Sequence, residues 1–283
     1  MTARAREISR LNRMTVREVM RKAGEHLTVV KDLDALHRHF ARAIADEVAA
    51  NNRAGKPTRL ILPYGPTGQY PYLVERVNAK GITLTNATFF FMDEYADEAG
   101  KDIPERHPLS FRGGMKGTWR AIRKDLRIAP ERVIFPLRRN VKKLAKMVRG
   151  EGGIGTCYGG VGLHGHLAFN EPEPGVRRSG PRLVRLNDYS VTINAIRSHI
   201  GGDLENYPRW AHTLGMAELL SARRMRYYVR SSDVEGLDWA NTVLRLVLFG
   251  EPGDDYPGTY IKTHADWGIV TDEVTVARPK HPL

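Results

Sequence analysis

Two histidines and a glutamate stand close together in a glycine-rich stretch that reads Gly-Gly-Val-Gly-Leu-His-Gly-His-Leu-Ala-Phe-Asn-Glu-Pro, from position 159 to position 172. Imidazole and carboxylate groups can move protons near neutral pH, and glycines let the backbone approach a ligand closely. His166 lies between a glycine and an apolar run, with His164 and Glu171 near enough in sequence to orient it. The stretch therefore indicates an active-site loop with His166 as its acid–base group, and a purely structural histidine is the alternative.

Metal binding is the competing interpretation of the same residues. His164, His166 and Glu171 could in principle supply metal ligands. Their spacing matches no common zinc pattern, and the only cysteine, Cys157, rules out a cluster of cysteine ligands. We therefore expect a site without a metal or other cofactor.

A second carboxylate, Asp93, stands where the apolar run 87–92 ends. A carboxylate at the end of a buried strand can serve as a general base at the rim of a pocket. It can equally accept a hydrogen bond from a nearby backbone N–H, so both roles stay open at this point. The next residue, Glu94, points to the opposite side of an extended chain, where we expect a structural salt bridge.

A candidate anion site lies in the loop 64–71, which follows an expected strand and leads into an expected helix. Free backbone N–H groups at a helix start favour an anion such as phosphate, although the same composition is typical of a simple turn. The candidates for substrate binding in this loop are Gly65, Thr67, Gly68 and Gln69. In the histidine loop, Gly160 and Gly162 are the candidates for a close approach to the substrate.

The order of the expected elements indicates an α/β fold with a Rossmann-like, predominantly parallel sheet and helices on both faces. Short apolar runs predict strands at 59–63, 87–92, 132–136, 155–158, 182–186, 226–229 and 267–270. Helical spacing predicts helices at 33–50, 72–78, 115–126, 141–149, 211–222 and 237–249. Ligands bind at the carboxyl ends of such strands, so we expect the loops after Leu62, Met92 and Tyr158 to converge.

The chain of 283 residues is long enough for one large α/β domain, which we place at residues 29–283. Residues 1–28 are expected to form a helical N-terminal extension that packs on its own domain. No apolar run has the length of a membrane span, and the N-terminus lacks the apolar core of a secretory signal. Together with the single cysteine, these observations favour a cytoplasmic protein that does not bind membranes.

The 44 lysine and arginine residues outnumber the 32 aspartate and glutamate residues, which gives a formal net charge of +12. This excess favours anionic partners such as phosphorylated metabolites. The basic groups at 112–124 and 138–149 carry little aromatic interleaving, so we interpret them as solvated helix faces and do not expect nucleic acid as a partner.

Three segments, taken together, resemble the glucosamine-6-phosphate deaminase/isomerase family. They are Phe-Met-Asp-Glu-Tyr at 91–95, His-Pro-Leu-Ser-Phe at 107–111, and the glycine-rich stretch at 159–172. The resemblance extends from about Val29 to about Val276, and Gly-His-Leu-Ala-Phe-Asn-Glu-Pro is its most specific part, because the related 6-phosphogluconolactonases share only the Gly-His pair. It implies a fold of the kind also found in ribose-5-phosphate isomerase and CoA transferase.

The resemblance also implies a reaction. Enzymes of this family open the sugar ring, shift a proton between C2 and C1 and release the C2 amine as ammonia without a metal, so that glucosamine 6-phosphate gives fructose 6-phosphate. Carried over to this chain, Asp93 is the base of the proton shift, His166 the ring-opening acid–base group and Glu171 the carboxylate that tunes it. Family members are often multimeric, which implies a homo-oligomer.

The chain departs from the family at two places. His164 stands where the family usually has Asp or Asn, and a second imidazole there could lower the pKa of His166. The positions of the family's phosphate-binding arginine and lysine hold other residues in this chain. We expect Arg197 and Arg230 to replace them, and the remaining candidates are Arg182 and Arg185.

These departures leave other functions open. The chain could be a sugar-binding protein without turnover, or an isomerase of a sugar that carries no phosphate. Lactone hydrolysis is a third alternative, which shares the fold but not the Asn-Glu-Pro signature at 170–172. All three keep a sugar or sugar phosphate as the small-molecule partner.

Overall fold

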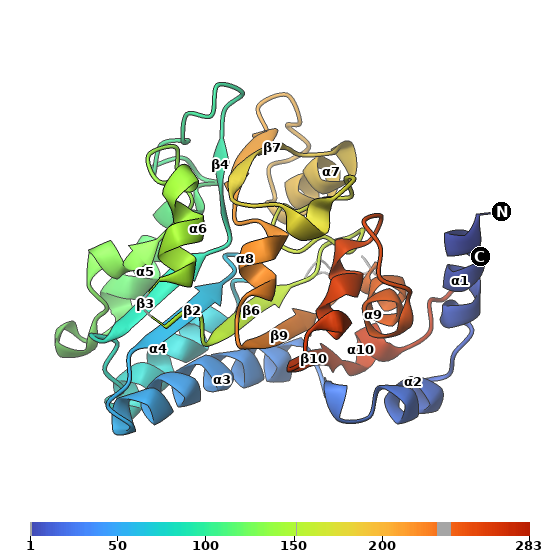
Figure 1. The fold of residues 1–283 in the computed structure, drawn as a ribbon, viewed down its shortest axis with the longest axis horizontal. Helices are drawn as coiled ribbons and strands as arrows, with labels where there is room; N and C mark the ends of the chain where they lie inside the picture. The colour runs from blue at the N-terminus through green and yellow to red at the C-terminus, as the bar shows by residue number, and fades with distance from the viewer. Residues whose placement is uncertain (1, 151, 231–238) are drawn as a thin grey trace.

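A seven-stranded, fully parallel sheet forms the centre of the molecule (Figure 1). The computed structural model describes residues 2–150, 152–230 and 239–283. The strand order is β1-β10-β9-β6-β2-β3-β5. The strands are β1 (Leu27–Val30), β2 (Thr58–Leu62), β3 (Ala87–Phe91), β5 (Val133–Ile134), β6 (Thr156–Gly160), β9 (Arg224–Val229) and β10 (Trp267–Asp272). The predicted α/β fold with a Rossmann-like sheet is confirmed.

The order in which strands are added to the sheet reverses between β2 and β6. From β2 the chain builds outward through β3 and β5, and it then returns to the middle to add β6, β9 and β10 on the other side. Loops at the carboxyl ends of the strands diverge at such a point and leave a crevice between them, which is where ligands bind in open α/β sheets. The topology therefore places a binding site beyond the ends of β2 and β6.

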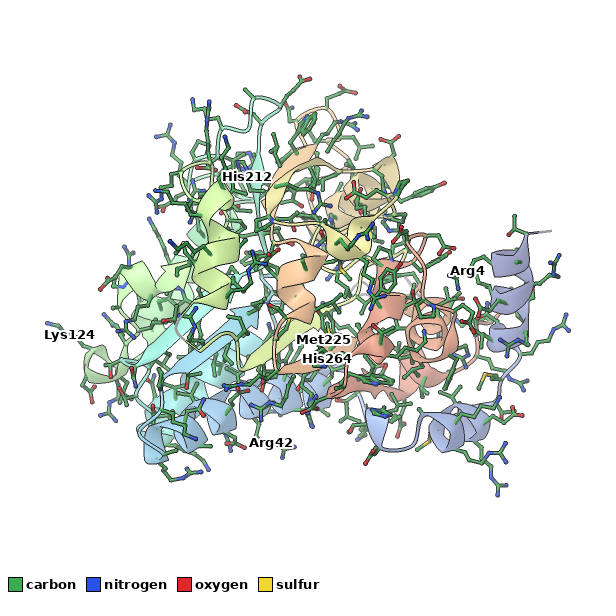
Figure 2. The ribbon with its side chains drawn as sticks, viewed as in Figure 1. Arg4, Arg42, Lys124, His212, Met225 and His264 are labelled. Atoms are coloured by element: carbon green, nitrogen blue, oxygen red, sulfur yellow. The ribbon has the colours of Figure 1, made fainter. Side chains whose placement is uncertain are left out.

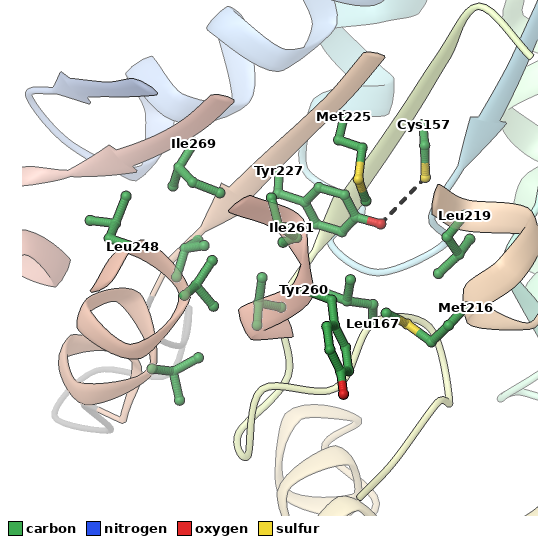
Figure 3. Packing of buried hydrophobic residues seen from close by; sticks show 14 of the residues in the cluster. Cys157, Leu167, Met216, Leu219, Met225, Tyr227, Leu248, Tyr260, Ile261 and Ile269 are labelled. Carbon is green, nitrogen blue, oxygen red and sulfur yellow. Dashed lines mark hydrogen bonds between the residues drawn. The ribbon is translucent and has the colours of Figure 1, made fainter. Parts of the chain in front are cut away.

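Apolar residues alternate between the two faces of the sheet. Ile61 and Phe90 pack in the core cluster on one face, whereas Leu60 packs in the cluster on the other. The Ile61 face is covered by α1 (Ala3–Asn12), α2 (Val16–Ala23), α6 (Val141–Arg149), α8 (Met216–Leu220), α9 (Ala240–Phe249) and α10 (Glu273–Val276). The Leu60 face is covered by α3 (Leu33–Arg53), α4 (Gln69–Lys80) and α5 (Phe111–Ala121). Figure 3 shows part of the Ile61 cluster, where the Tyr227 hydroxyl lies 3.3 Å from the Cys157 sulfur.

A small antiparallel sheet stands at the carboxyl edge of the main sheet (Figure 1). Its order is β4-β8-β7, and its strands are β4 (Asp93–Ala96), β8 (Trp210–Thr213) and β7 (Arg182–Arg185). The chain enters it directly from β3 through Met92, and α7 (Asp188–Arg197) follows β7. This second sheet therefore brings further segments to the mouth of the crevice.

Two sequence-based predictions of elements are wrong in part. The helix predicted over 211–222 begins only at Met216, because Trp210–Thr213 forms β8 and the extended Gly215 separates the two elements. Tryptophan and threonine favour a strand, a local preference that the helical spacing concealed. The strand predicted at 182–186 exists as β7, but it pairs in the antiparallel sheet rather than in the parallel one.

Several short elements were not predicted, and β1 and α7 show two different reasons. β1 has only four residues and gains its backbone hydrogen bonds from β10, so its own sequence carries little signal. α7 did carry one, since the side chain of Asn187 accepts a hydrogen bond from Ser190 N at 2.9 Å as an N-cap.

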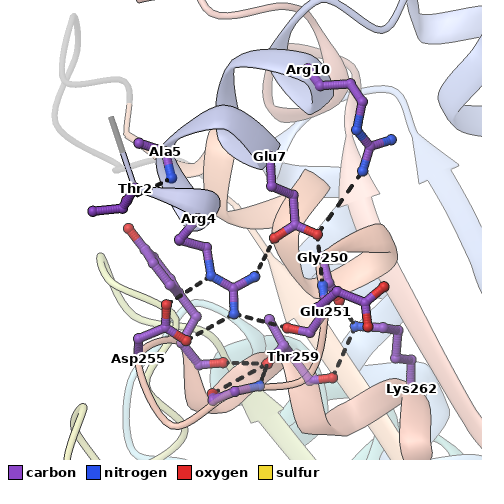
Figure 4. Close-up of polar contacts among 12 residues, drawn as sticks. Thr2, Arg4, Ala5, Glu7, Arg10, Gly250, Glu251, Asp255, Thr259 and Lys262 are labelled. Carbon is purple, nitrogen blue, oxygen red and sulfur yellow. Dashed lines mark hydrogen bonds and ion pairs between the residues drawn. The ribbon is translucent and has the colours of Figure 1, made fainter.

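The N-terminal helices pack on their own domain, as predicted. Leu11 of α1 and Val19 of α2 are buried in the same cluster as α9. Arg4 reaches beyond α9 and donates two hydrogen bonds to Asp255, at 2.7 and 2.8 Å, as seen in Figure 4. The proposed boundary between an extension at 1–28 and a domain at 29–283 falls within β1 and stays a prediction about independent folding.

Arg245 of α9 is fully buried against the N-terminal helices and the segment after β10. Its guanidinium donates hydrogen bonds to the carbonyls of Asn241, Val276 and Ala277 at 3.0–3.1 Å, and to that of Met14 at 3.4 Å. Burial lowers the pKa of Arg245 to about 10. One side chain thus connects the N-terminal helices, α9 and the segment after β10.

Basic side chains are distributed over the surface rather than restricted to one element. Arg42 on α3 and Lys124 after α5 lie at separate places on the molecular outline (Figure 2). Several exposed arginines have acidic partners, including Arg38 with Asp34 and Arg123 with Asp125. Among the described residues, no helix is both long and apolar enough to cross a bilayer.

Candidate active site

A cavity of about 340 Å³ opens at the carboxyl ends of β2, β3, β6 and β9. It is lined by the loop after β2, Pro63–Thr67, by Met92 and Asp93 after β3, and by the end of β6 with the following residues, Gly160–Gly162. The predicted convergence of these three loops is confirmed. The volume lies within the range of ~300–1,000 Å³ that is usual for small-molecule sites.

Asp93 lies in the cavity wall, at the passage from the parallel sheet to the small one. The passage is fixed by Met92, whose carbonyl accepts a hydrogen bond from Leu214 N at 2.7 Å. Asp93 is only 8 % exposed, and burial together with the nearby carboxylate of Glu94 raises its pKa to about 8. A carboxyl group that titrates near neutral pH in a cavity is typical of a functional site.

Glu94 points away from Asp93 and holds the start of α5. Its fully buried carboxylate accepts hydrogen bonds from the backbone N–H groups of Tyr95, Phe111 and Arg112 at 2.8–3.0 Å. The Arg112 guanidinium also lies 3.6 Å away. The predicted structural salt bridge is confirmed, and its effect is to fix the N-terminus of α5 beside the cavity.

The histidine loop folds back on itself so that His166 faces the cavity. Gly162 N donates to the carbonyl of His166 at 2.9 Å, and Gly165 supplies the left-handed turn with φ +74°. Gly162 stands directly beside the ring, since a Cβ there would lie 1.9 Å from His166 Nε2. Ala168 also takes a left-handed conformation, with φ +53°, which is uncommon for a residue with a side chain.

The loop is tied to the rest of the molecule through Asn170. Its amide nitrogen donates to the carbonyls of Leu167 and Leu214, both at 2.9 Å, and its oxygen accepts from Ser179 and Arg182. Asn170 is completely buried. The asparagine in the family-specific run therefore positions the loop and does not face the cavity.

His166 and His164 are joined by a hydrogen bond between their Nδ1 atoms, 3.2 Å apart. The other ring nitrogen of His164, Nε2, contacts the side-chain amide of Asn187. Burial lowers the pKa of His166 to about 3, with smaller contributions from His164 and Arg197, and burial lowers the pKa of His164 to about 4. Both imidazoles are therefore neutral at physiological pH, and the direction expected for His166 is the one found.

Glu171 lies close to the two imidazoles but does not line the cavity. It accepts a hydrogen bond from Asn187 N at 2.7 Å, and burial raises its pKa. One ligand atom from each of His164, His166 and Glu171 lies within 4.8 Å of the others, so the three could surround a cation. Two of these three groups, the imidazoles of His164 and His166, are hydrogen-bonded directly to each other.

Arg197 and Arg230 both line the cavity, together with Gly65 and Thr67 of the loop after β2. Arg197 is the last residue of α7 and Arg230 follows β9, so each arginine reaches the cavity from a different element. Gly160 and Gly162 line it as well, whereas the candidates Gly68, Gln69, Arg182 and Arg185 do not. Gln69 is buried in the first turn of α4, where it donates to the carbonyl of Pro66, and Gly68 packs against the ring of His37.

The cavity also contains residues that the sequence did not single out. They are mainly aromatic or polar, and they include Tyr95, Phe111, Asn194, Ser198, Tyr228 and Trp239. Phe111 belongs to the His-Pro-Leu-Ser-Phe segment, which was a recognisable signal. Asn194 and Ser198 belong to α7 or follow it, so they could not be placed without predicting that helix.

Three relatives found by sequence comparison carry the same name. The chain is 30 % identical over 207 residues to a glucosamine-6-phosphate deaminase of Phocaeicola vulgatus, a match that covers 70 % of this chain and 74 % of the relative. It is 28 % identical over 263 residues to the enzyme of the same name from Parabacteroides distasonis, covering 89 % and 90 % of the two chains. The relative in Caenorhabditis elegans is 28 % identical over 214 residues, covering 73 % and 76 %. No protein-family model matches the chain.

Solved structures share the fold. One, described as a monomeric glucosamine-6-phosphate deaminase of the NagB superfamily, superposes with a TM-score of 0.75 at 21 % identity and covers 88 % of this chain and 98 % of that one. A 6-phosphogluconolactonase from Plasmodium vivax superposes with a TM-score of 0.62 at 15 % identity, covering 87 % and 90 %. At such identities the likeness concerns the arrangement of helices and strands and leaves the chemistry to the site residues.

Proposed function

Because the chain belongs to the glucosamine-6-phosphate deaminase family, we propose that it converts glucosamine 6-phosphate, or a closely similar amino-sugar phosphate, into the corresponding ketose phosphate with release of ammonia. The observation that carries the proposal is the composition of one cavity. Asp93 and His166 face it together with Arg197 and Arg230. Groups for proton transfer and groups for an anion therefore share a space of small-molecule size.

Asp93 is the base of the proton shift in this proposal. The reaction requires one group that removes the proton from C2 and returns it to C1, and a carboxylate in a fixed position suits such a transfer. The passage between β3 and β4 holds Asp93 in the cavity wall, and Glu94 on the other side of the strand is occupied by the start of α5. Among these two neighbouring carboxylates, only Asp93 is available to a substrate.

His166 is the group that exchanges protons or hydrogen bonds with the oxygen atoms of the sugar. It reaches the cavity from the loop opposite Asp93, and the family assignment gives it the opening of the sugar ring. His164 and Glu171 support it from behind. Glu171 acts indirectly, because its carboxylate fixes Asn187, which in turn contacts His164.

The phosphate group binds between Arg197, Arg230 and the loop that contains Gly65 and Thr67. Guanidinium groups match the geometry of phosphate oxygens and stay charged at all relevant pH values. Arg230 is only 7 % exposed, so a phosphate there would be recognised in a partly desolvated environment. Replacement of Arg197 or Arg230 by glutamine should raise KM for a phosphorylated sugar more than for the same sugar without phosphate.

Proton NMR in D₂O tests the reaction, because deuterium replaces the C2 proton whenever the base acts, even if net conversion is slow. The wild-type protein should exchange this proton in glucosamine 6-phosphate, and Asp93→Asn should not. Asp46→Asn, on the exposed side of α3, is the matched control and should keep full activity. Exchange at the wild-type rate in Asp93→Asn would refute the assignment of the base.

We also propose that the protein forms a homo-oligomer. The support is an exposed apolar pair on α7, Tyr189 at 70 % and Ile196 at 47 % exposure, seven residues apart and so on one face of the helix. Light scattering after gel filtration gives the molecular mass in solution, and a mass of 31.9 kDa would rule the oligomer out. A cytoplasmic location is a further proposal, supported by the single cysteine as a buried thiol, and cell fractionation tests it.

A further inference from the structure

The orientation of the Asn187 side chain decides where the proton sits on His166. The amide oxygen of Asn187 accepts a hydrogen bond from Ser190 N, as the N-cap of α7. Since the oxygen is used there, the group that faces His164 Nε2 is the NH₂ group, which can only donate. His164 Nε2 must therefore accept, and it carries no proton.

The unprotonated Nε2 atom of His164 fixes the position of the proton on both imidazoles. A neutral His164 without a proton on Nε2 carries its proton on Nδ1, and it donates this proton across 3.2 Å to the Nδ1 atom of His166. The Nδ1 atom of His166 then accepts, so the proton of that ring sits on Nε2. This Nε2 atom lies beside Gly162, within the cavity lining.

We propose that Asn187 and His164 hold His166 as a neutral imidazole with a proton on Nε2, and that His166 stabilises the sugar oxygen O1 during the proton shift rather than opening the sugar ring. The inference rests on the proposed function and changes one role within it. A base for ring opening would have to accept the proton of the O1 hydroxyl, and an Nε2 atom that already carries a proton has no lone pair to do so. A neutral imidazole is, however, an effective hydrogen-bond donor to a carbonyl oxygen in an enolisation.

The step balances without a change in the charge of His166. Ionised Asp93 takes the C2 proton of the open-chain sugar, the C–H electron pair forms a C1=C2 double bond, and the carbonyl π pair moves onto O1. The Nε2–H group of His166 donates a hydrogen bond to O1 while this charge develops. O1 then receives a proton from the C2 ammonium group, and Asp93 returns its proton to C1. The resulting C2 iminium group takes up water and loses ammonium, which leaves the ketose.

Nitrogen-15 NMR of histidine-labelled protein tests the tautomer without any turnover. We expect a protonated Nε2 and an unprotonated Nδ1 for His166, with the reverse for His164, and signals assigned by their loss in the two histidine variants. Asn187→Asp should move the proton to the other nitrogen in both rings, because a carboxylate can accept hydrogen bonds from Ser190 N and from a protonated His164 Nε2 at once. Asn86→Asp, exposed at the amino end of β3, adds the same charge far from the cavity and should change neither ring. A protonated Nδ1 on His166 in the wild-type protein would overturn the proposal.

Kinetics test the role. Ring opening is measured as the rate at which the α and β anomers interconvert, and enolisation as deuterium exchange at C2. The wild-type protein should accelerate exchange but not anomer interconversion. His166→Ala should lose ~10²–10³-fold in exchange, the usual loss for one donor to a developing oxyanion. His166→Gln, which keeps an N–H donor but no titrating ring, should exchange at least ~10-fold faster than His166→Ala by the same reasoning.

Two results would contradict this role: a wild-type protein that accelerates anomer interconversion, or a glutamine variant no faster than the alanine variant. These outcomes differ from a failure of the proposed function itself. If no amino-sugar phosphate were exchanged at all, the reaction would be refuted, while the nitrogen spectra would still show whether Asn187 and His164 set the tautomer.

Discussion

At the scale of single residues, the buried position of Asp93 disfavours the ionised carboxylate that the reaction needs. The carboxyl group must be ionised to act as a base, but burial and Glu94 raise its pKa to about 8. The fraction of ionised Asp93 in the free protein therefore increases as the pH rises through about 8. We expect kcat/KM for C2 exchange to rise over the same interval and to level off above it, as a pH–rate profile of the wild-type protein would show.

The same shift predicts a stability effect of Asp93. The pKa of Asp93 is higher in the folded protein than in the unfolded chain, where it is near 3.8. The folded protein therefore has its full free energy of unfolding when Asp93 is protonated in both states, at low pH, and it loses stability as the pH rises through about 8. Asp93→Asn keeps a neutral side chain at every pH. Its melting temperature should exceed that of the wild-type protein by a margin that grows between pH 4 and pH 8. A pKa shift of this size corresponds to ~5 kcal/mol, so the margin should reach ~10–20 °C, since ~1 kcal/mol corresponds to ~2–4 °C in large domains. A margin independent of pH would contradict the burial argument.

Gly162 is important for steric reasons. A Cβ at this position would overlap the ring of His166 at 1.9 Å, and the backbone itself does not require glycine because φ is not positive. Gly162→Ala should therefore keep the fold but displace the imidazole, and we expect kcat to fall by ~10²-fold, as for other displacements of about 1 Å. Gly117→Ala on α5, where a Cβ meets open space, is the control for the added methyl group. Equal kcat values in the two variants would show that His166 moves aside without loss.

At the scale of elements, the first helix supports the histidine loop through a chain of contacts. Arg4 of α1 binds Asp255 and lies over the ring of Tyr256, with 5.6 Å between guanidinium and ring centre. Tyr256 in turn packs against Gly165, and Gly258 N donates to the Gly165 carbonyl. The segment after α9 thus lies between α1 and the turn that carries His166.

This arrangement predicts that a substitution far from the cavity lowers activity. Arg4→Ala should reduce kcat several-fold with little change in KM, because it loosens the support of Gly165 but touches no substrate group. The loss of unfolding free energy should be small, about 1 kcal/mol or less, as is usual for ion pairs near the surface. Arg38→Ala, which breaks an exposed ion pair on α3, should leave kcat unchanged. Parallel measurements of kcat and urea unfolding on both variants check the prediction.

The elements also show what a sequence can and cannot predict. Apart from the edge strand β1, the strands of the parallel sheet were predictable because most of their residues are apolar and buried, as in Phe89–Phe91. The antiparallel β4-β8-β7 sheet was not, because its strands are short and partly polar and are defined by their pairing with each other. Asp93 and His166 could be predicted from their positions after strands. The link from Asn187 to His164 could not, because it joins α7 to a loop more than twenty residues earlier.

At the scale of the whole molecule, the net charge of +12 has a kinetic consequence. A phosphorylated sugar is attracted over long distances by the positive potential, and salt screens this attraction. We expect kcat/KM for the phosphorylated substrate to fall as ionic strength is raised from ~0.01 M to ~0.15 M, where the Debye length shortens from ~30 Å to ~8 Å. For the same sugar without phosphate, kcat/KM should not fall. A substrate-independent effect would instead indicate a general loss of activity in salt.

The buried guanidinium of Arg245 also determines which helices unfold together. It holds carbonyls from the start of the described chain, from α9 and from the segment after β10, so none of these parts can separate without leaving a charge in an apolar interior. The first and last helices should consequently open together, as one cooperative unit. Amide protons of α2, α9 and α10 would then exchange with solvent at a common free energy of opening, whereas in Arg245→Met the helix α2 would open on its own at a lower one.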